Sequence, residues 1–283
     1  MIRERPLLSV QLSVGYRTKP GVLKDVKLEI AAGEIVGLVG QSGSGKSTLA
    51  MAIPRLLDLR KANVTGEIVF QGEDLCQKGE SQLRAIRGKQ ISIVLQSPLT
   101  ALNPALRIGF QLREAWRAHA TGDRAESLMA IRAALTSVSL PSVDEFLARK
   151  PSQLSVGQAQ RVVIAMAILH RPALLIADEA TSALDAITHS EILELFGRLN
   201  HEMGTAILYI SHDLLSVAAL CQRIAILNAG QIVECDTPKA IFNSPGHPYT
   251  RMLIGALPTR PEQARDRVLT AALSASETAL CQK

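Results

Sequence analysis

The feature that most constrains this chain is an eight-residue glycine-rich loop, Gly40-Gln-Ser-Gly-Ser-Gly-Lys-Ser47. It follows the apolar run 35–39 and precedes the helical stretch 48–53. The spacing G-x-x-x-x-G-K-[ST], between a strand and a helix, is typical of a phosphate-binding P-loop. The glycines let backbone N–H groups turn inward at the positive end of the helix, where they hold anions. A chance glycine-rich turn is the alternative, and the flanking strand and helix argue against it.

The loop predicts how a nucleotide is held. Lys46 is expected to reach the β- and γ-phosphates, and the Ser47 hydroxyl is expected to be a ligand of Mg²⁺. The rest of the loop and the first residue after it are expected to contact the nucleotide: Gly40, Gln41, Ser42, Gly43, Ser44, Gly45 and Thr48.

Polar residues follow three further predicted strands. Gln96 comes after 91–95, and Asp178-Glu179 comes directly after 173–177. His212 follows the strand 205–210. Ligands bind at the carboxyl ends of strands in open α/β sheets, so these residues become candidates for one site.

Each of these residues has a predicted role. The Gln96 amide can place its oxygen on a metal or a water, and Asp178 would be a second support for Mg²⁺. Glu179 would orient or deprotonate the attacking water, and His212 would sense the γ-phosphate. The alternatives are an acid pair at a helix start for Asp178 and Glu179, and a structural histidine for His212.

Two other residues have two interpretations each. Tyr16 lies upstream of the P-loop and can either stack on an adenine or shield the core. Ser155 stands where a helix from about 159 to 170 begins, and it can simply cap that helix.

Composition excludes several classes. The net charge is +5, spread along the chain, which indicates a solvated face more than an anionic partner such as a membrane surface. Aromatic residues are only 3%, so no stacking platform for single-stranded nucleic acid is expected. Residues 1–6 have no hydrophobic signal region, and the longest apolar run, 162–169, is too short to cross a bilayer. The four cysteines lack metal-ligand spacing, which fits free thiols in the cytoplasm.

The coarse pattern along the chain divides it into parts. Residues 7–14 and 26–30 alternate like strands with a turn at Gly15-Tyr16, and 223–227 with 231–235 predict a hairpin. The helical pattern from about 108 to 150 indicates an insertion between halves of an α/β core, with a stripe at Leu128, Ile131, Leu135 and Val138. The polar, alanine-rich stretch after 258 is expected to be a flexible tail.

In this order the motifs resemble the nucleotide-binding subunit of an ABC transporter, over about residues 7–258. The motifs that carry the resemblance are the A-loop aromatic Tyr16, the P-loop 40–47, the Q-loop Gln96, the signature Leu154-Ser-Val-Gly-Gln158, the Walker B run with Glu179, the D-loop Ser182-Ala-Leu-Asp185 and the switch His212. Residues 95–104 and 244–250 resemble the branch that imports oligopeptides, dipeptides and nickel.

The resemblance implies a fold and partners. The fold would be α/β, a RecA-like P-loop NTPase core with an antiparallel β subdomain and a helical insertion subdomain. One ATPase domain would cover 1–258, with the insertion at about 97–160 and a tail at 259–283. ATP and Mg²⁺ would be the cofactors. Two subunits would face each other head to tail, so Ser155, Gly157 and Gln158 would contact the nucleotide on the other subunit.

The resemblance also implies a transport system. Transmembrane permease subunits would be driven by the closing dimer, gripped beside the Q-loop and the insertion, where Leu99, Leu102 and Leu106 suggest an apolar docking surface. An extracytoplasmic binding protein would deliver the cargo, and the ATPase would lie peripherally on the cytoplasmic face of the inner membrane, with no role for nucleic acid.

The chain departs from the family pattern at three points. Val156 replaces the usual signature glycine, Ala180 replaces the usual proline after Glu179, and the cysteine-rich segment of many members is missing. The first departure suggests a heterodimer in which this subunit completes the weaker site. The alternative is that position 156 faces away from the nucleotide and tolerates valine. Two other functions remain alternatives: a soluble ABC ATPase acting on DNA or ribosomes, and a P-loop kinase. The former would carry a coiled-coil insertion, zinc modules or tandem cassettes, and the latter would not need the signature. The cargo, peptide or nickel, is not identified by this sequence.

Overall fold

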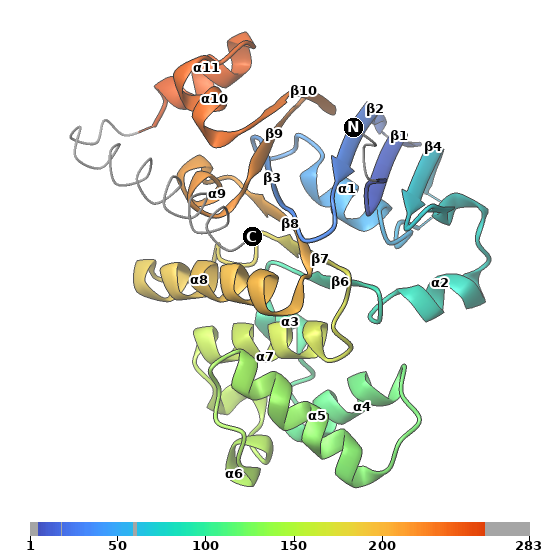
Figure 1. Ribbon diagram of the computed structural model, residues 1–283, viewed down its shortest axis with the longest axis vertical. Coiled ribbons are helices and arrows are strands. Elements are labelled where there is room, and N and C mark those ends of the chain that lie inside the picture. Colours follow the sequence, from blue (N-terminus) through green and yellow to red (C-terminus); the bar gives the residue numbers. More distant parts are fainter. Residues whose placement is uncertain (1–4, 18, 59–60, 258–283) are drawn as a thin grey trace, which may run out of the picture.

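A computed structural model describes residues 5–17, 19–58 and 61–257 (Figure 1). The predicted tail, 259–283, lies outside the described residues. In Figure 1 the two sheets occupy the upper half and a group of helices forms the lower end.

The larger sheet is buried and mostly parallel. Its six strands lie in the order β10-β9-β3-β8-β7-β6, and every neighbouring pair is parallel except the predicted hairpin of β9 and β10, which is confirmed. All residues of β3, β7 and β8 are buried, as expected for strands covered on both faces. The strands are β3 (Ile35–Val39), β6 (Ile91–Val94), β7 (Leu174–Asp178), β8 (Ala206–Ser211), β9 (Arg223–Asn228) and β10 (Gln231–Asp236).

The smaller sheet is antiparallel, with the order β2-β1-β4-β5. Its strands are β1 (Leu8–Tyr16), β2 (Lys19–Ile30), β4 (Ala62–Phe70) and β5 (Glu73–Asp74). The turn predicted at Gly15-Tyr16 is wrong, because both residues continue β1. Tyr16 pairs with Lys19 of β2 and with Ala62 of β4, so ladders on both sides hold this end of the strand extended.

The helices fall into two groups. The lower group in Figure 1 comprises α3 (Pro98–Ala101), α4 (Ile108–Arg117), α5 (Arg124–Ser137), α6 (Asp144–Leu147) and α7 (Val156–Ile168). The predicted stripe on α5 is largely confirmed: Ile131, Leu135 and Val138 are buried, and Leu128 is half-buried. The others are α1 (Lys46–Ala52), α2 (Glu80–Ile86), α8 (Ala186–Met203), α9 (Leu214–Leu220), α10 (Pro238–Asn243) and α11 (Pro248–Gly255).

Two apolar clusters hold these layers together. One joins the antiparallel sheet and α1 to residues of the larger sheet such as Val36, Leu38 and Ile210. The other joins residues that alternate with them, such as Ile35, Val39 and Tyr209, to α7, α8 and α9, and it continues into α4 and α5. The parallel strands are therefore clamped from both faces, which fixes the positions of their carboxyl ends.

Candidate nucleotide site

The register of the larger sheet brings the predicted site residues to one edge. Val39 of β3 is level with Ser211 of β8, and Asp178 of β7 is level with Ile210 of β8. The next strand, β6, ends two residues before Gln96. Four neighbouring strands thus deliver the P-loop, His212, the two carboxylates and Gln96 side by side, at the edge where parallel sheets bind ligands.

The P-loop needs its glycines for space. A Cβ on Gly40 would lie 2.2 Å from the Leu227 carbonyl oxygen, and a Cβ on Gly45 would lie 2.6 Å from Leu23 Cδ2. Gly45 also has φ of +111°, a backbone conformation that favours glycine, where the loop enters α1. The loop therefore packs against its surroundings with no room for side chains at these two points.

Lys46 is held against the loop. Its side chain is only 5% exposed, and its Nζ donates to the carbonyl oxygens of Gly40 at 2.7 Å and Gln41 at 3.1 Å. Buried ammonium groups are costly unless they are hydrogen-bonded or paired. The loop carbonyls satisfy this requirement and keep the cation where phosphate would bind.

A cavity of about 540 Å³ opens over the loop. The P-loop, Gln96 and Glu179 line it together, and Tyr16 at the end of β1 forms part of its wall. Lys19 and Val22 of β2 also line it, and sequence reasoning missed both. The predicted contact residues in the wall are Tyr16, Ser42, Gly43, Gly45, Lys46, Ser47, Thr48, Gln96 and Glu179.

Glu179 stands between the side chains of Lys46 and His212. One carboxylate oxygen lies 3.8 Å from Lys46 Nζ, and the other lies 3.7 Å from His212 Nδ1. Its side chain is 21% exposed, whereas that of His212 is 61% exposed. The carboxylate therefore lines the cavity between the Lys46 ammonium and the accessible His212 imidazole.

The backbone at Glu179 is unusual for a residue with a side chain. Its φ is +49°, and its N–H donates to the Ile210 carbonyl at 2.9 Å, which extends the β7–β8 ladder by one bond. A left-handed non-glycine residue costs free energy and persists only where its surroundings impose it. The sequence pattern does not predict this positive φ. The side chain of Glu179 lines the cavity.

Asp178 is a buried carboxylate with an unused oxygen. The residue is 6% exposed, and among the described residues its Oδ1 has no hydrogen-bond partner. Burial raises the pKa of Asp178, although a hydrogen bond from Ser47 and the charge of Lys46 oppose that shift. An orphaned, desolvated carboxylate oxygen next to a serine hydroxyl is a fitting environment for a divalent cation.

The signature residues lie elsewhere. Ser155 caps α7 by accepting from the Gln158 N–H at 3.2 Å, and Gln158 Oε1 accepts from the Ser155 N–H at 3.2 Å. A Cβ on Gly157 would lie 2.7 Å from Thr188 Cγ2, so glycine allows α7 to approach α8. Ser155 therefore caps its own helix, which was one of the two interpretations of this residue. None of the three residues lines the cavity over the P-loop of the same chain.

One contact at the site joins residues far apart in the chain. The Gln41 N–H donates to the Tyr249 hydroxyl oxygen at 3.1 Å, across 208 positions. Tyr249 belongs to the segment 244–250, whose sequence suggested only a branch of transporters. No local pattern predicts which backbone group a buried hydroxyl meets.

The fold and this site define a P-loop ATPase in which the glycine-rich loop, the acidic end of β7 and the histidine after β8 share one sheet edge. Residues 23–182 match the family model described as ABC transporter. Residues 233–280 match the model described as oligopeptide/dipeptide transporter, C-terminal region. The chain belongs to the ABC transporter family, as an ATP-binding cassette ATPase.

Similar proteins and structures agree with this membership. The dipeptide transport ATP-binding protein DppD of Bacillus subtilis is 40% identical over 89% of this chain and 77% of that protein. The oligopeptide transport ATP-binding protein OppD of Haemophilus influenzae is 40% identical over 89% of this chain and 79% of that protein. The dimeric structure of a bacterial ABC transporter cassette is 30% identical, with a TM-score of 0.72 over 82% of this chain and 98% of that chain.

Proposed function

We propose that this ATPase powers the import of peptides through partner membrane subunits. One observation carries the proposal: the ABC ATPase region is followed, in the same chain, by the C-terminal region typical of oligopeptide and dipeptide transporters. The relatives named above, a dipeptide and an oligopeptide transport protein, support this cargo class. Neither supports the DNA, ribosome or kinase alternatives, or nickel as cargo.

The site residues would have different roles in ATP hydrolysis. The Lys46 ammonium has three N–H donors and uses two on the Gly40 and Gln41 carbonyls, so on ATP binding it would give the third to the phosphates while the loop carbonyls keep it in place. Glu179 would accept a proton from the attacking water, and His212 would hold the γ-phosphate from the open side. Mg²⁺, held by Ser47, Gln96 and Asp178, would neutralise phosphate charge.

A second ATPase subunit would complete the site. Ser155, Gly157 and Gln158 do not line the cavity of their own chain, so their contact with ATP requires another subunit. The cassette cited above is dimeric, which supports that arrangement. We propose a related but different ATPase as the partner, because Val156 makes one of the two signatures atypical.

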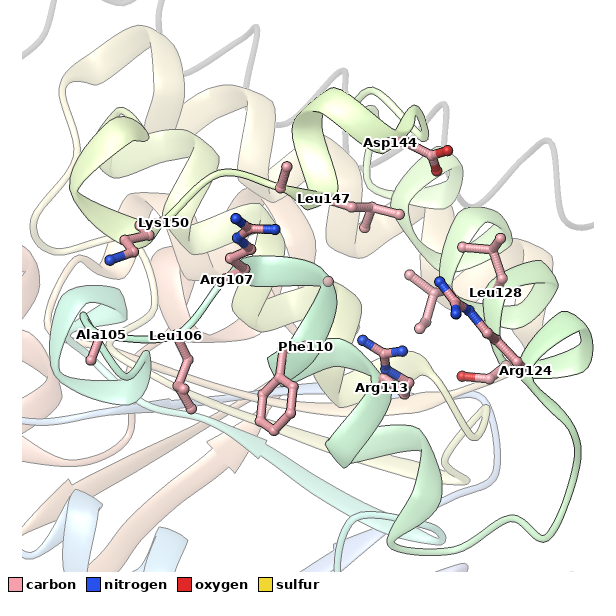
Figure 2. A pocket seen from close by; sticks show the side chains of 14 residues that line it. Ala105, Leu106, Arg107, Phe110, Arg113, Arg124, Leu128, Asp144, Leu147 and Lys150 are labelled. Carbon is pink, nitrogen blue, oxygen red and sulfur yellow. The ribbon is translucent and has the colours of Figure 1, made fainter.

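The membrane subunits would dock at the helical end of the molecule. A cavity of about 720 Å³ lies among α4, α5 and α6, directly after the Q-loop segment. Figure 2 shows the side chains that line it. Arg107, Arg113 and Arg124 line it and form no ion pair with other described residues, whereas Asp144 is paired with Arg132 at 2.9 Å. An acidic segment with an apolar side chain fits this basic surface.

The apolar part of the docking surface differs from the predicted one. Leu102 is 2% exposed and packs in the core, so it is not available to a partner. Leu99 is 51% exposed and Phe110 is 42% exposed, and Leu106 is half-buried. Figure 2 shows Leu106 and Phe110 along the cavity edge. The exposed apolar groups of this surface are therefore Leu99 in α3 and Phe110, and Phe110 lines the cavity together with the arginines.

Docking would place the chain on the cytoplasmic face of the inner membrane as a peripheral subunit. Within residues 5–17, 19–58 and 61–257, no helix combines the length and the apolarity that a bilayer crossing needs. An extracytoplasmic binding protein would complete the system by delivering the peptide.

Reconstitution tests the proposal. The chain is co-expressed with its genomically adjacent permease and ATPase subunits, purified as a complex and placed in liposomes with the binding protein. ATP-dependent uptake is measured for a dipeptide, a pentapeptide, glutathione and Ni²⁺. Uptake of at least one peptide is expected. Uptake of Ni²⁺ alone, or failure of the chain to join any membrane complex, would overturn the peptide-import proposal.

A further inference from the structure

Tyr249, which lies outside the predicted nucleotide-binding motifs, reaches the P-loop through a side-chain hydrogen bond. Its hydroxyl accepts from the Gln41 N–H at 3.1 Å. The residue is 9% exposed and packs in the core cluster, and the bond itself is partly buried. Solvent therefore replaces such a bond only in part when one partner is removed.

The geometry of the peptide unit gives this contact a function. The Gln41 N–H and the Gly40 carbonyl belong to one planar peptide unit, so they cannot turn independently. Tyr249 holds the N–H end of this unit, and Lys46 Nζ donates to its carbonyl end at 2.7 Å. A rotation of the unit that frees the N–H also moves the oxygen that positions the lysine.

Tyr249 is itself fixed by a network. Glu234 of β10 accepts from the N–H groups of Gly246 at 2.8 Å and His247 at 3.0 Å. His247 Nδ1 accepts from the Tyr249 N–H at 3.1 Å and so caps α11, with Pro248 in its first turn. Two successive backbone groups are thus pinned just before the helix that carries the tyrosine.

We propose that Tyr249 is a positioning residue for ATP binding, through which the C-terminal segment sets the orientation of the Gly40–Gln41 peptide unit and thereby of Lys46. This inference rests on the proposed phosphate-binding role of the P-loop. It gives the C-terminal region a role in ATP binding, although none of the nucleotide-binding motifs lies there. Loss of the hydroxyl is expected to weaken ATP binding more than it slows the chemical step.

The test is Tyr249→Phe in the full chain, which removes one oxygen and keeps the ring. KM for ATP and Kd for a fluorescent ATP analogue should rise about two- to tenfold, the range that one net hydrogen bond supports, with kcat changed less than twofold. Hydrogen exchange of the P-loop peptide that contains Gln41 should become faster. An unchanged KM with unchanged exchange would overturn the proposal.

Two controls separate positioning from general damage. Tyr209→Phe also removes a buried hydroxyl, which bonds Thr181 at 2.9 Å, but it leaves the P-loop peptide unit untouched. It should lower the unfolding temperature without raising KM. If both variants raise KM equally, the effect reports lost stability and the assignment to Tyr249 fails.

Two further variants complete the design. Gln41→Pro removes the donor from the other side of the same bond, so combining it with Tyr249→Phe should be no worse than the poorer single variant. Fully additive losses of ATP affinity would show that the two residues do not act through one shared bond.

Lys46→Ala distinguishes failure of this inference from failure of the proposed nucleotide site on which it rests. Abolished binding in Lys46→Ala with a normal Tyr249→Phe refutes only the positioning role, whereas normal ATP binding in Lys46→Ala refutes the proposed nucleotide site itself.

Discussion

Lys46 and Glu179 face each other across the floor of the nucleotide cavity, with the ammonium nitrogen 3.8 Å from a carboxylate oxygen. Because Lys46 is also bonded to two loop carbonyls, it does not depend on Glu179 for its hydrogen bonds. The carboxylate is therefore free to serve a water molecule while the lysine serves phosphate. This division of roles leads to the first prediction.

Glu179→Gln should retain ATP binding and lose turnover. The amide keeps the shape of the side chain but accepts no proton, and a positioned general base contributes about 10²- to 10⁴-fold to rate. The affinity for ATP is expected to stay equal or rise, because a negative charge beside the γ-phosphate is removed. Phosphate release and binding of a fluorescent ATP analogue measure the two effects. Hydrolysis at near wild-type rate would exclude Glu179 as the base.

His212→Ala should lower kcat at least about tenfold with a small effect on ADP affinity. The imidazole is 61% exposed and touches the carboxylate from the open side, where a γ-phosphate but not the β-phosphate of ADP is expected. His201→Ala, in the exposed last turn of α8, is the matched control and should behave like wild type. Equal kcat in the two variants would remove His212 from the mechanism.

Sequence patterning predicted the site because its parts are local. A P-loop is one contiguous motif, and Asp178, Glu179 and His212 stand at or just after the ends of buried strands, so the rule for parallel sheets was enough to gather them. The ladder that extends β1 through Tyr16 and the burial of Leu102 depend on partners distant in sequence. The Gln41–Tyr249 bond spans 208 positions, and no periodicity encodes such a pairing.

Phe110→Ala should uncouple the chain from its membrane subunits without changing ATP hydrolysis by the isolated protein. Phe110 is 42% exposed on α4 and lines a cavity with three arginines that form no ion pair with other described residues, and it does not line the nucleotide cavity. Burial of an aromatic ring at an interface contributes strongly to affinity, so co-purification with the permease should fall severalfold. Met129→Ala, 71% exposed on α5 and outside the cavity, is the control. Equal recovery of the permease with both variants would place the docking surface elsewhere.

The C-terminal network should make stability depend on acid pH through Glu234. Burial alone would raise the pKa of Glu234, but the Thr250 hydroxyl, the N–H groups of Gly246 and His247 and the nearby imidazole outweigh it and hold the pKa below its ordinary value of 4.5. A carboxyl whose pKa is lower in the folded state stabilises the fold above the unfolded-state pKa and loses that contribution as pH falls through the folded-state value.

Glu234→Gln tests this linkage. The unfolding temperature is measured between pH 7 and pH 3.5 for the wild type and the variant. The difference between the two proteins should be largest at neutral pH and should shrink below about pH 4.5. Glu202→Gln, on an exposed residue of α8, is the control and should give a small difference at every pH. A constant gap between wild type and Glu234→Gln would show that the charge of Glu234 is not involved.

Val156→Gly should raise the turnover of the composite site that this subunit completes. Val156 is 41% exposed at the first position of α7, between Ser155 and Gly157, and its isopropyl group stands where backbone N–H groups would approach a phosphate on the other subunit. Loss of part of a charge-assisted hydrogen bond costs about 1–3 kcal/mol, so removal of the side chain should speed that site by about tenfold. The change costs less than about 1 kcal/mol of helix propensity and opens no cavity.

Val143→Gly, on another exposed valine at the start of α6, is the matched control. Single-site turnover is measured in the assembled complex with the opposite site inactivated by its own Glu→Gln change. An unchanged rate at the partner's P-loop, or a fully active homodimer of this chain, would end the idea of two unequal sites.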